Sequence, residues 1–388
     1  MTTLEGLCRA SLLLLLPWLW SCALAPKAQM AAEAAGLAPV LAECRCQVIG
    51  LGTGTLEPGG EEQLWMADVR GVHRVGSGGR TESLWTAPRF TEVLRFEAAD
   101  IDGDGVSEWV VLLDSGRMRS FVLRWDGESW QPSAPWAGYL RPLRDGRGEL
   151  TLVGQRSGGS TAYRGLITRV LVGESGSLTA GEPVPSPPGV SIYDFFWLRG
   201  DPGRLFVLES NGSISERDPR SPTVGAGPGP RSGWGVLWRS EDRPVARPVE
   251  VEREVRDLLG DLRDERIRLA PPVAVVQLDD DPAEEVLVVT GVPAPQVVFE
   301  NLRLYRGGDI RAYDPELRGL KELHRTPLLG RSLSAVVAVE RGGEDLWVGA
   351  IWTRLPGGFT RPESRLLLFD PASGNVVGPS LAAGGDEP

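Results

Sequence analysis

Residues 98–113 read Ala98-Ala-Asp-Ile-Asp-Gly-Asp-Gly-Val-Ser-Glu108-Trp-Val-Val-Leu-Leu113. Asp100, Asp102 and Asp104 are spaced two apart, and Gly103 and Gly105 let the backbone curl so that the three carboxylates converge. Such a group of hard oxygen ligands suits Ca²⁺, which takes about six to eight oxygens in a flexible geometry. Three carboxylates on one turn also repel one another unless a cation neutralises them. The stretch therefore predicts a calcium loop.

The residues that follow the loop decide the kind of calcium site. An EF-hand needs a bidentate Glu at position 12 of the loop and a helix after it. Position 12 is Val111, and it lies in the apolar run Trp109–Leu113, which is typical of a buried strand. The acidic residue comes early, at position 9, as Glu108. The pattern excludes an EF-hand and predicts a loop that leads directly into a β-strand.

A calcium loop that closes at its ninth residue and continues as a strand resembles the FG-GAP/VCBS repeat, the blade unit of integrin-α-like β-propellers. The resemblance implies an all-β fold in which blades form a closed ring. It also implies a Ca²⁺ ion held by Asp100, Asp102, Asp104, the Val106 carbonyl and Glu108, with water completing the shell. We expect the ion to be structural, pinning the edge of one blade.

A polar or Gly-containing turn followed by an apolar strand recurs along the chain. Six copies are visible, with strands that begin at Glu62, Glu108, Glu149, Arg204, Glu285 and Asp345. Their starts are roughly 40–80 residues apart, which overlaps the spacing of propeller blades. We predict a β-propeller of six or seven four-stranded blades, with Trp65, Trp109 and Trp347 at equivalent positions in its core. The acidic turn 279–285 is the best second copy of the loop, and we interpret it as two residues shorter and without the ion.

One insert interrupts the repeats. Apolar residues recur there at i, i+4, i+7, i+8 and i+11, a spacing that places them on one face of a helix: Val251, Val255, Leu258, Leu259 and Leu262. We therefore predict a short amphipathic helix within the insert 241–270, packed against the propeller.

The N-terminus has the features of a targeting segment. Arg9 precedes an apolar run, Ser11–Trp20, that is too short to span a bilayer comfortably. The run ends in Leu19-Trp-Ser-Cys22, which resembles a bacterial lipobox and implies that Cys22 is lipidated. We predict a signal peptide at 1–21, a lipidated tether at 22–45, a propeller at 46–376 and a flexible tail at 377–388. Soluble secretion and an uncleaved anchor are the alternatives.

Composition and the absence of catalytic motifs narrow the classes of function that this chain could perform. The net charge of −11 argues against nucleic acid as a partner, because neutralising phosphates requires a basic surface. Cys44 and Cys46 are too close to bridge without strain if the chain between them is extended. The two histidines, His73 and His324, are far apart, and the sequence has no nucleophile elbow. These features predict a protein without a catalytic site.

The combined prediction is a monomeric, calcium-stabilised propeller lipoprotein. It would act as a non-catalytic binding or scaffolding module for a protein or glycan ligand. It would be anchored to the outer or inner membrane, facing the periplasm or exterior, or else be secreted. Two alternatives remain open at this stage. One is a lectin-like propeller that stacks sugars on tryptophans of predicted loops, which are Trp130, Trp136 and Trp234. The other is a polysaccharide-degrading enzyme on the same scaffold.

Overall fold

The fold was analysed in a computed structural model. It describes residues 40–377 except for 77–78, 159–161, 201–202, 219–233, 243–248, 257–261, 271, 279–280, 282, 294–304, 330–331, 342–343, 354–362, 371–373 and 375. These described residues form strands and turns and include no α-helix. In particular, they contain no helix that is long and apolar enough to cross a membrane. The predicted signal peptide, Cys22 and nearly all of the predicted tail lie outside the described residues.

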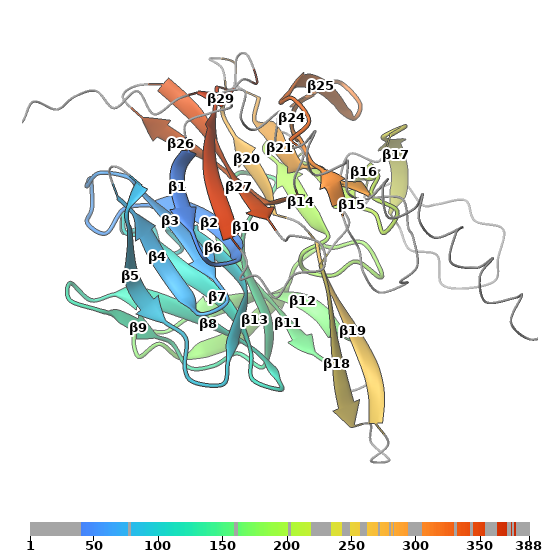
Figure 1. The fold of residues 1–388 in the computed structure, drawn as a ribbon. Helices are drawn as coiled ribbons and strands as arrows, with labels where there is room; N and C mark the ends of the chain where they lie inside the picture. Colours follow the sequence, from blue (N-terminus) through green and yellow to red (C-terminus); the bar gives the residue numbers. More distant parts are fainter. Residues whose placement is uncertain are drawn as a thin grey trace, which may run out of the picture. The chain divides into compact units, whose positions relative to one another are not determined.

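Six antiparallel sheets follow one another along the chain as the blades of a propeller (Figure 1). The first three blades are β2 (Val48–Gly54), β3 (Gln63–Asp68), β4 (Gly71–Val75) and β5 (Thr81–Thr86); β6 (Glu92–Ala99), β7 (Glu108–Asp114), β8 (Met118–Trp125) and β9 (Trp130–Pro132); and β10 (Gly138–Arg144), β11 (Leu150–Ser157), β12 (Tyr163–Val172) and β13 (Leu178–Pro183). The next two are β14 (Phe195–Leu198), β15 (Arg204–Leu208), β16 (Ile214–Asp218) and β17 (Gly235–Arg239); and β20 (Val273–Val276), β21 (Glu285–Val289), β24 (Ile310–Pro315) and β25 (Leu320–Arg325). The sixth contains β26 (Ser332–Arg341), β27 (Glu344–Thr353) and β28 (Glu363–Phe369).

The first strands of the blades form the inner ring. β2 contacts β6 and β26, β10 contacts β6 and β14, and β20 contacts β26. The loops between first and second strands also touch from blade to blade: the Gly200 amide donates to the Gly146 carbonyl (3.2 Å), and the Arg199 amide donates to Glu284 (3.1 Å). These contacts place the first-to-second loops at one end of the propeller.

The ring is closed by the N-terminal strand of the described chain. β1 (Val40–Cys44) pairs with β28 and becomes the fourth strand of the last blade, where Cys44 lies opposite Ser364. The short strand β29 (Val376–Val377) pairs with the same strand, β28. The predicted boundary at residue 46 was therefore wrong, because the propeller already begins at Val40. Closure of this kind removes an edge that would otherwise be free to pair with other chains.

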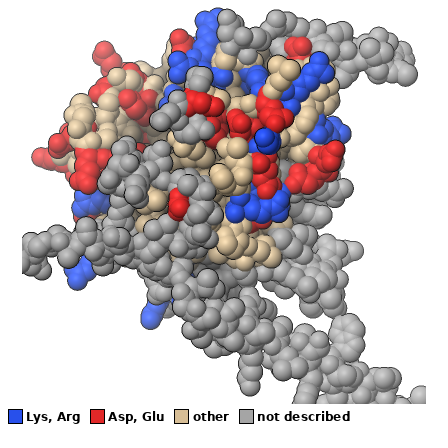
Figure 2. Space-filling model, turned by 90° about the horizontal axis from the view of Figure 1, so that it is seen from above, with Lys and Arg blue, Asp and Glu red and all other residues tan. Residues whose placement is uncertain are grey.

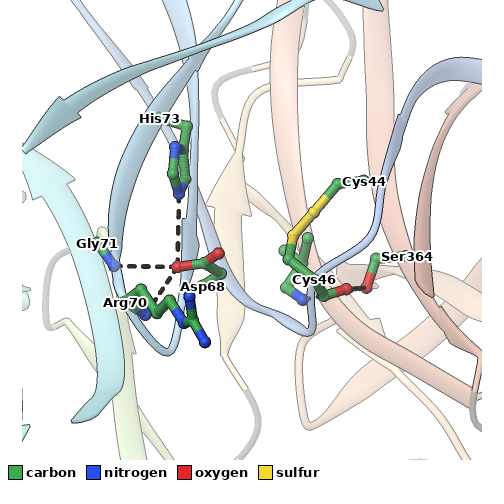
Figure 3. The surroundings of a disulfide bond; sticks show 8 residues. Cys44, Cys46, Asp68, Arg70, Gly71, His73 and Ser364 are labelled. Atoms are coloured by element: carbon green, nitrogen blue, oxygen red, sulfur yellow. Dashed lines mark hydrogen bonds and ion pairs between the residues drawn. A yellow bond between two sulfur atoms is a disulfide. The ribbon is translucent and has the colours of Figure 1, made fainter. Parts of the chain in front are cut away.

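A disulfide joins Cys44 and Cys46 at this closure, where the chain passes from the last blade to the first (Figure 3). The expectation against a bridge assumed an extended chain, but residues 45–46 form a bend that brings the two Cα atoms to 5.2 Å. Ser364, which is fully buried, fixes the same corner: its hydroxyl donates to the Cys46 carbonyl (2.8 Å) and accepts from the Val48 amide (3.0 Å).

Two additional hairpins leave the ring, β18–β19 (Val249–Arg256 and Leu262–Leu269) and β22–β23 (Val292–Pro293 and Tyr305–Gly307). The predicted helix in the insert 241–270 was wrong, because this segment forms β18 and β19, with Val251 paired to Ile267. The sequence Val249–Arg256 also alternates Val or Arg with Glu, a period of two that favours a strand. Ile267 is fully buried in the main core, so pairing and packing at the hairpin base override the helical spacing.

The repeats that the sequence predicted are confirmed as the second strands of all six blades, namely β3, β7, β11, β15, β21 and β27. Trp65, Trp109 and Trp347 lie on three of them and are fully buried, as expected for repeated core packing. The apolar runs therefore identified the strands that are buried on both faces within each blade.

Candidate calcium loop

The predicted loop joins the first and second strands of the second blade, β6 and β7. Its backbone takes the left-handed conformation at Gly103 (φ 78°) and Gly105 (φ 85°), which L-residues with a side chain rarely adopt. The neighbouring blade supports it, because the Thr55 hydroxyl donates to the Gly105 carbonyl (2.6 Å) and the Ser107 amide donates to the Thr55 carbonyl (2.9 Å). The loop is thus built into the contact between the first and second blades.

Three carboxylates converge in this loop. Asp100, Asp102 and Glu108 each offer an oxygen, and these oxygens all lie within 4.8 Å of one another. Asp100 also organises the turn, because its two oxygens accept the amides of Gly103 (2.8 Å) and Gly105 (3.0 Å). The spacing of these residues in the sequence therefore correctly predicted that the three side chains converge.

Asp104 is placed differently from the other predicted ligands. Its Oδ1 accepts the Val106 amide (2.8 Å), and its carboxylate is not part of the group of three. The expectation that all three aspartates converge holds for Asp100 and Asp102 but not for Asp104, and Glu108 is the third member of the group. Ligation by Asp104 and by the Val106 carbonyl stays a prediction.

Glu108 is the buried member of the group, with 3% of its surface exposed. Burial raises the pKa of its carboxyl from an ordinary value of 4.5 to about 7, and Asp102 and Asp104 act in the same direction. The Ile101 amide, which donates to Glu108 Oε2 (2.8 Å), and Arg124 oppose this rise in pKa. An ionised Glu108 is therefore costly to the protein alone, and a divalent cation beside it would remove that cost.

Arg124, from β8, is the cationic side chain at the group. Its Nη2 lies 2.9 Å from Asp102 Oδ2, and its Nε lies 3.9 Å from Glu108 Oε1. This ion pair is partly exposed, so it offsets the acidic charge only modestly. Arg124 faces the same two carboxylates that a cation would bind.

The acidic turn of the fifth blade repeats the frame of this loop. Glu285 Oε2 accepts the Leu278 amide (2.6 Å), just as Glu108 accepts Ile101, and each pair is seven residues apart. Asp281 Oδ1 accepts the Ala283 amide (2.7 Å), as Asp104 accepts Val106. The interpretation of this turn as two residues shorter was wrong: it has the same length, and Gln277 stands where the complete loop has Asp100. The sequence does carry a sign of this equal length. Gln277 and Glu285 are eight residues apart, as are Asp100 and Glu108.

Exposed acidic residues surround the loop at this end of the first two blades. They come from the β2–β3 loop, the calcium loop and the β8–β9 turn, and are Glu57, Glu61, Glu62, Asp102, Asp104, Asp126 and Glu128. Figure 2, which views the molecule from above, shows acidic side chains along the left margin of the visible face and others among basic side chains toward its centre and right. Their combined potential favours the approach of cations to the loop.

Two of the three tryptophans proposed to stack on sugars do not offer free faces. Trp130 is 6% exposed and stacks on Trp109 with their ring centres 3.4 Å apart. Trp136 is 2% exposed, and the Arg156 guanidinium lies 3.9 Å from its ring centre. Trp234 is partly buried against the main core. The assignment of Trp130 and Trp136 to sugar-stacking loops was wrong, because neighbouring strands and blades cover both rings.

His73 lies on β4. Its Nε2 is 3.4 Å from Asp68 Oδ1, and the same oxygen accepts the amides of Arg70 (2.7 Å) and Gly71 (3.0 Å) (Figure 3). Asp68 therefore closes the β3–β4 turn, and His73 adds to this local network.

No family model matches the chain, and no curated protein matches it. The solved structures that resemble it include the following three. A triple arginine-to-alanine mutant of AofleA from Arthrobotrys oligospora has a TM-score of 0.45 at 11% identity, over 87% of this chain and 90% of that chain. BBS1N in complex with ARL6DN has a TM-score of 0.39 at 13% identity, over 88% and 99%. Saccharomyces cerevisiae Sqt1 has a TM-score of 0.35 at 9% identity, over 88% and 100%. All three scores lie below 0.5, and the six-bladed architecture rests on the strand pairing of this chain itself.

Proposed function

We propose that this six-bladed β-propeller is a calcium-stabilised lipoprotein of the FG-GAP/VCBS type. In this proposal it is anchored to a cell-envelope membrane through Cys22, faces the periplasm or exterior, and acts without catalysis as a binding or scaffolding module. The observation that supports it best is the group formed by Asp100, Asp102 and Glu108, whose oxygens lie within 4.8 Å of one another at the junction of two blades.

The donor set suits Ca²⁺ on chemical grounds. All three side chains are carboxylates, the hard oxygen ligands that Ca²⁺ prefers, and the raised pKa of Glu108 shows that the protein alone compensates this carboxylate poorly. A bound ion would supply charge neutralisation and would tie β6 to β7 beside the first blade. Its role would be structural, because the loop lies where two blades meet.

Calcium added to the full chain is expected to bind at one site. The affinity expected for a module outside the cytoplasm is roughly 10⁻⁴–10⁻³ M. Asp100→Asn should abolish measurable binding, because it removes one of the three carboxylate ligands and weakens the acceptor of the Gly103 and Gly105 amides. Isothermal titration with calcium chloride measures both proteins.

Two variants sharpen this test. Asp126→Asn removes an exposed carboxylate of the neighbouring turn and should leave calcium binding unchanged. Arg124→Gln removes the cation that faces Asp102 and should tighten calcium binding roughly twofold to fivefold, the effect of one exposed ion pair. Equal losses in Asp100→Asn and Asp126→Asn would mean that calcium binds only diffusely, and the calcium part of the proposal would fail.

Lipidation of Cys22 makes a separate prediction. Cys22→Ala should move the protein from the membrane fraction to the soluble fraction, because a diacylglycerol-modified cysteine supplies the two acyl chains that stable anchoring needs. Cell fractionation and immunoblotting of the producing bacterium measure this distribution, with Cys8→Ala as the control. Membrane association that survives Cys22→Ala would contradict the anchor and favour an uncleaved N-terminal segment.

The proposed binding role rests on architecture. Loops at the two ends of a propeller are held by a rigid ring, and binding residues concentrate on loops positioned by rigid scaffolds. The end that carries the calcium loop is acidic over the first two blades, so a ligand that binds there would present a complementary basic surface.

A further inference from the structure

A second charged cluster lies outside the calcium loop, on the inner strands of the ring. Arg95 and Glu97 belong to β6, and Arg141 belongs to β10. Both arginines are buried, with 8% and 7% of their surfaces exposed. Arginine is rarely buried unless its charge is compensated, so the partners of these two side chains indicate what the cluster can do.

The arginines reach across the axis of the propeller. Arg95 Nη1 donates to the Ala270 carbonyl (2.7 Å), at the start of the fifth blade, which is opposite the second blade in a ring of six. The Arg95 guanidinium also lies 4.3 Å from the centre of the Tyr193 ring, which leads into the fourth blade. Arg141 Nη1 donates to the carbonyls of Phe195 (2.6 Å) and Ile192 (3.2 Å). Four blades therefore converge on this cluster.

The acidic charge in the cluster is smaller than the basic charge. Glu97 is shared: Arg95 Nε donates to its Oε1, and Arg141 Nε lies 3.5 Å from its Oε2. Among the residues that the structure describes, two guanidinium groups thus face one carboxylate, which leaves an excess of one positive charge in a buried site. The three carbonyls contribute dipoles but no charge.

Arg141 is the less well compensated of the two arginines. Burial lowers the pKa of Arg141, and repulsion from Arg95 adds to this, whereas Glu97 opposes it. Burial acts on Arg95 too, but Glu97 and neighbouring groups raise its pKa above the ordinary value. Within the part of the chain that the structure describes, Arg141 Nε makes no hydrogen bond beyond its ion pair with Glu97, and Nη2 of neither arginine has a hydrogen-bond partner.

We propose that Arg95 and Arg141 bind a small oxyanion, such as a carboxylate or an inorganic phosphate, on the axis of the propeller. Guanidinium donors match the oxygens of carboxylates and phosphates, and one negative charge would balance the cluster at two against two. The ligand would join side chains of the second and third blades to segments of the fourth and fifth. This site is independent of the calcium loop and of membrane anchoring.

The test titrates sodium phosphate, and separately sodium acetate, into the full chain at constant ionic strength held with sodium chloride. Acetate allows the measurement to be repeated in the presence of calcium. We expect saturable binding at one site, and a higher melting temperature in the oxyanion than in chloride. The absence of binding by both probes in the wild type would overturn the proposal.

Variants locate the site. Arg141→Gln should weaken oxyanion binding at least about tenfold, the effect of losing one charge-assisted hydrogen bond. Arg74→Gln removes the same charge from an exposed pair with Glu82 and should change nothing. Equal weakening by both variants would mean that the oxyanion binds through general surface charge, against the proposal.

Arg141→Gln is a change in the core, and circular dichroism would show whether it folds. Glu97→Gln provides a second test, which does not depend on the folding of Arg141→Gln and in which oxyanion binding is expected to become tighter instead of weaker. Removing the competing carboxylate leaves both arginines for the ligand, so oxyanion affinity should increase by roughly tenfold, and the melting temperature in chloride should fall. Unchanged or weaker affinity in Glu97→Gln would contradict a site between these two arginines.

Discussion

Trp109→Ala is expected to lower the free energy of unfolding by about 3–5 kcal/mol, the largest effect of any single change considered. Trp109 is fully buried on β7 and stacks on Trp130 at an interplanar angle of 20°. It also meets Trp65 of the first blade edge to face, with ring centres 5.2 Å apart. Alanine would leave a cavity at the contact between two blades. Because folded domains have about 5–15 kcal/mol of stability in total, this loss would be a large fraction.

Urea unfolding followed by far-ultraviolet circular dichroism measures the effect at fixed calcium concentration. Trp109→Phe should be milder, because the indole N–H of Trp109 has no hydrogen-bond partner in the described structure and phenylalanine carries no such group. Trp85→Ala is the control on a partly buried tryptophan of the same core. A cost for Trp109→Ala no greater than that for Trp85→Ala would show that the aromatic cluster does not hold the two blades together.

Glu108→Gln is expected to stabilise the protein by up to about 3 kcal/mol at pH 8 in calcium-free buffer. The pKa of Glu108 rises from 4.5 to about 7 in the folded protein, so folding favours its protonated form. Its contribution to stability is fully present below pH 4.5 and is lost as the pH rises through about 7. Glutamine stays neutral throughout and does not lose this contribution.

The measurement compares unfolding free energies of the two proteins from pH 4 to pH 8, with and without calcium. Calcium should reverse the order at pH 8, because the ion favours the carboxylate and glutamine lacks its charge. Glu57→Gln, in the exposed loop of the adjacent blade, should follow the wild type. A difference between Glu108→Gln and wild type that does not change with pH would contradict the raised pKa.

Local spacing predicted much of the architecture because it reflects short-range geometry. A turn and an apolar run determine a strand without reference to the remainder of the chain, so the second strands of all six blades were found. In the same way, Asp102 and Glu108 follow Asp100 by two and eight residues on one loop, and this spacing was enough to predict that they lie close to it. The preference of each glycine for a left-handed backbone is also local.

Other features depend on pairing and could not be derived from spacing. Residues 251–262 satisfy a helical period, whereas Val249–Arg256 alternates like a strand, and the partner strand β19 decides between them. Trp130 and Trp136 follow turns and looked exposed, but stacking on Trp109 and beneath Arg156 covers their rings. The equal length of the fifth-blade loop became clear from its hydrogen bonds, since Gln277 carries no acidic signal.

The sequence alone determined that this chain is built of repeated strands and that carboxylates converge on one acidic loop. Both follow from neighbours along the chain. The tertiary structure decided how the ring closes, since Cys44 pairs with Ser364 across some 320 residues, and which charges meet on its axis. Arg95 belongs to β6, Arg141 to β10 and the Ala270 carbonyl to the segment that precedes β20, so their meeting depends on the ring as a whole. Contacts between residues so far apart leave no periodic pattern in the sequence, because each residue separately fits an ordinary strand or loop.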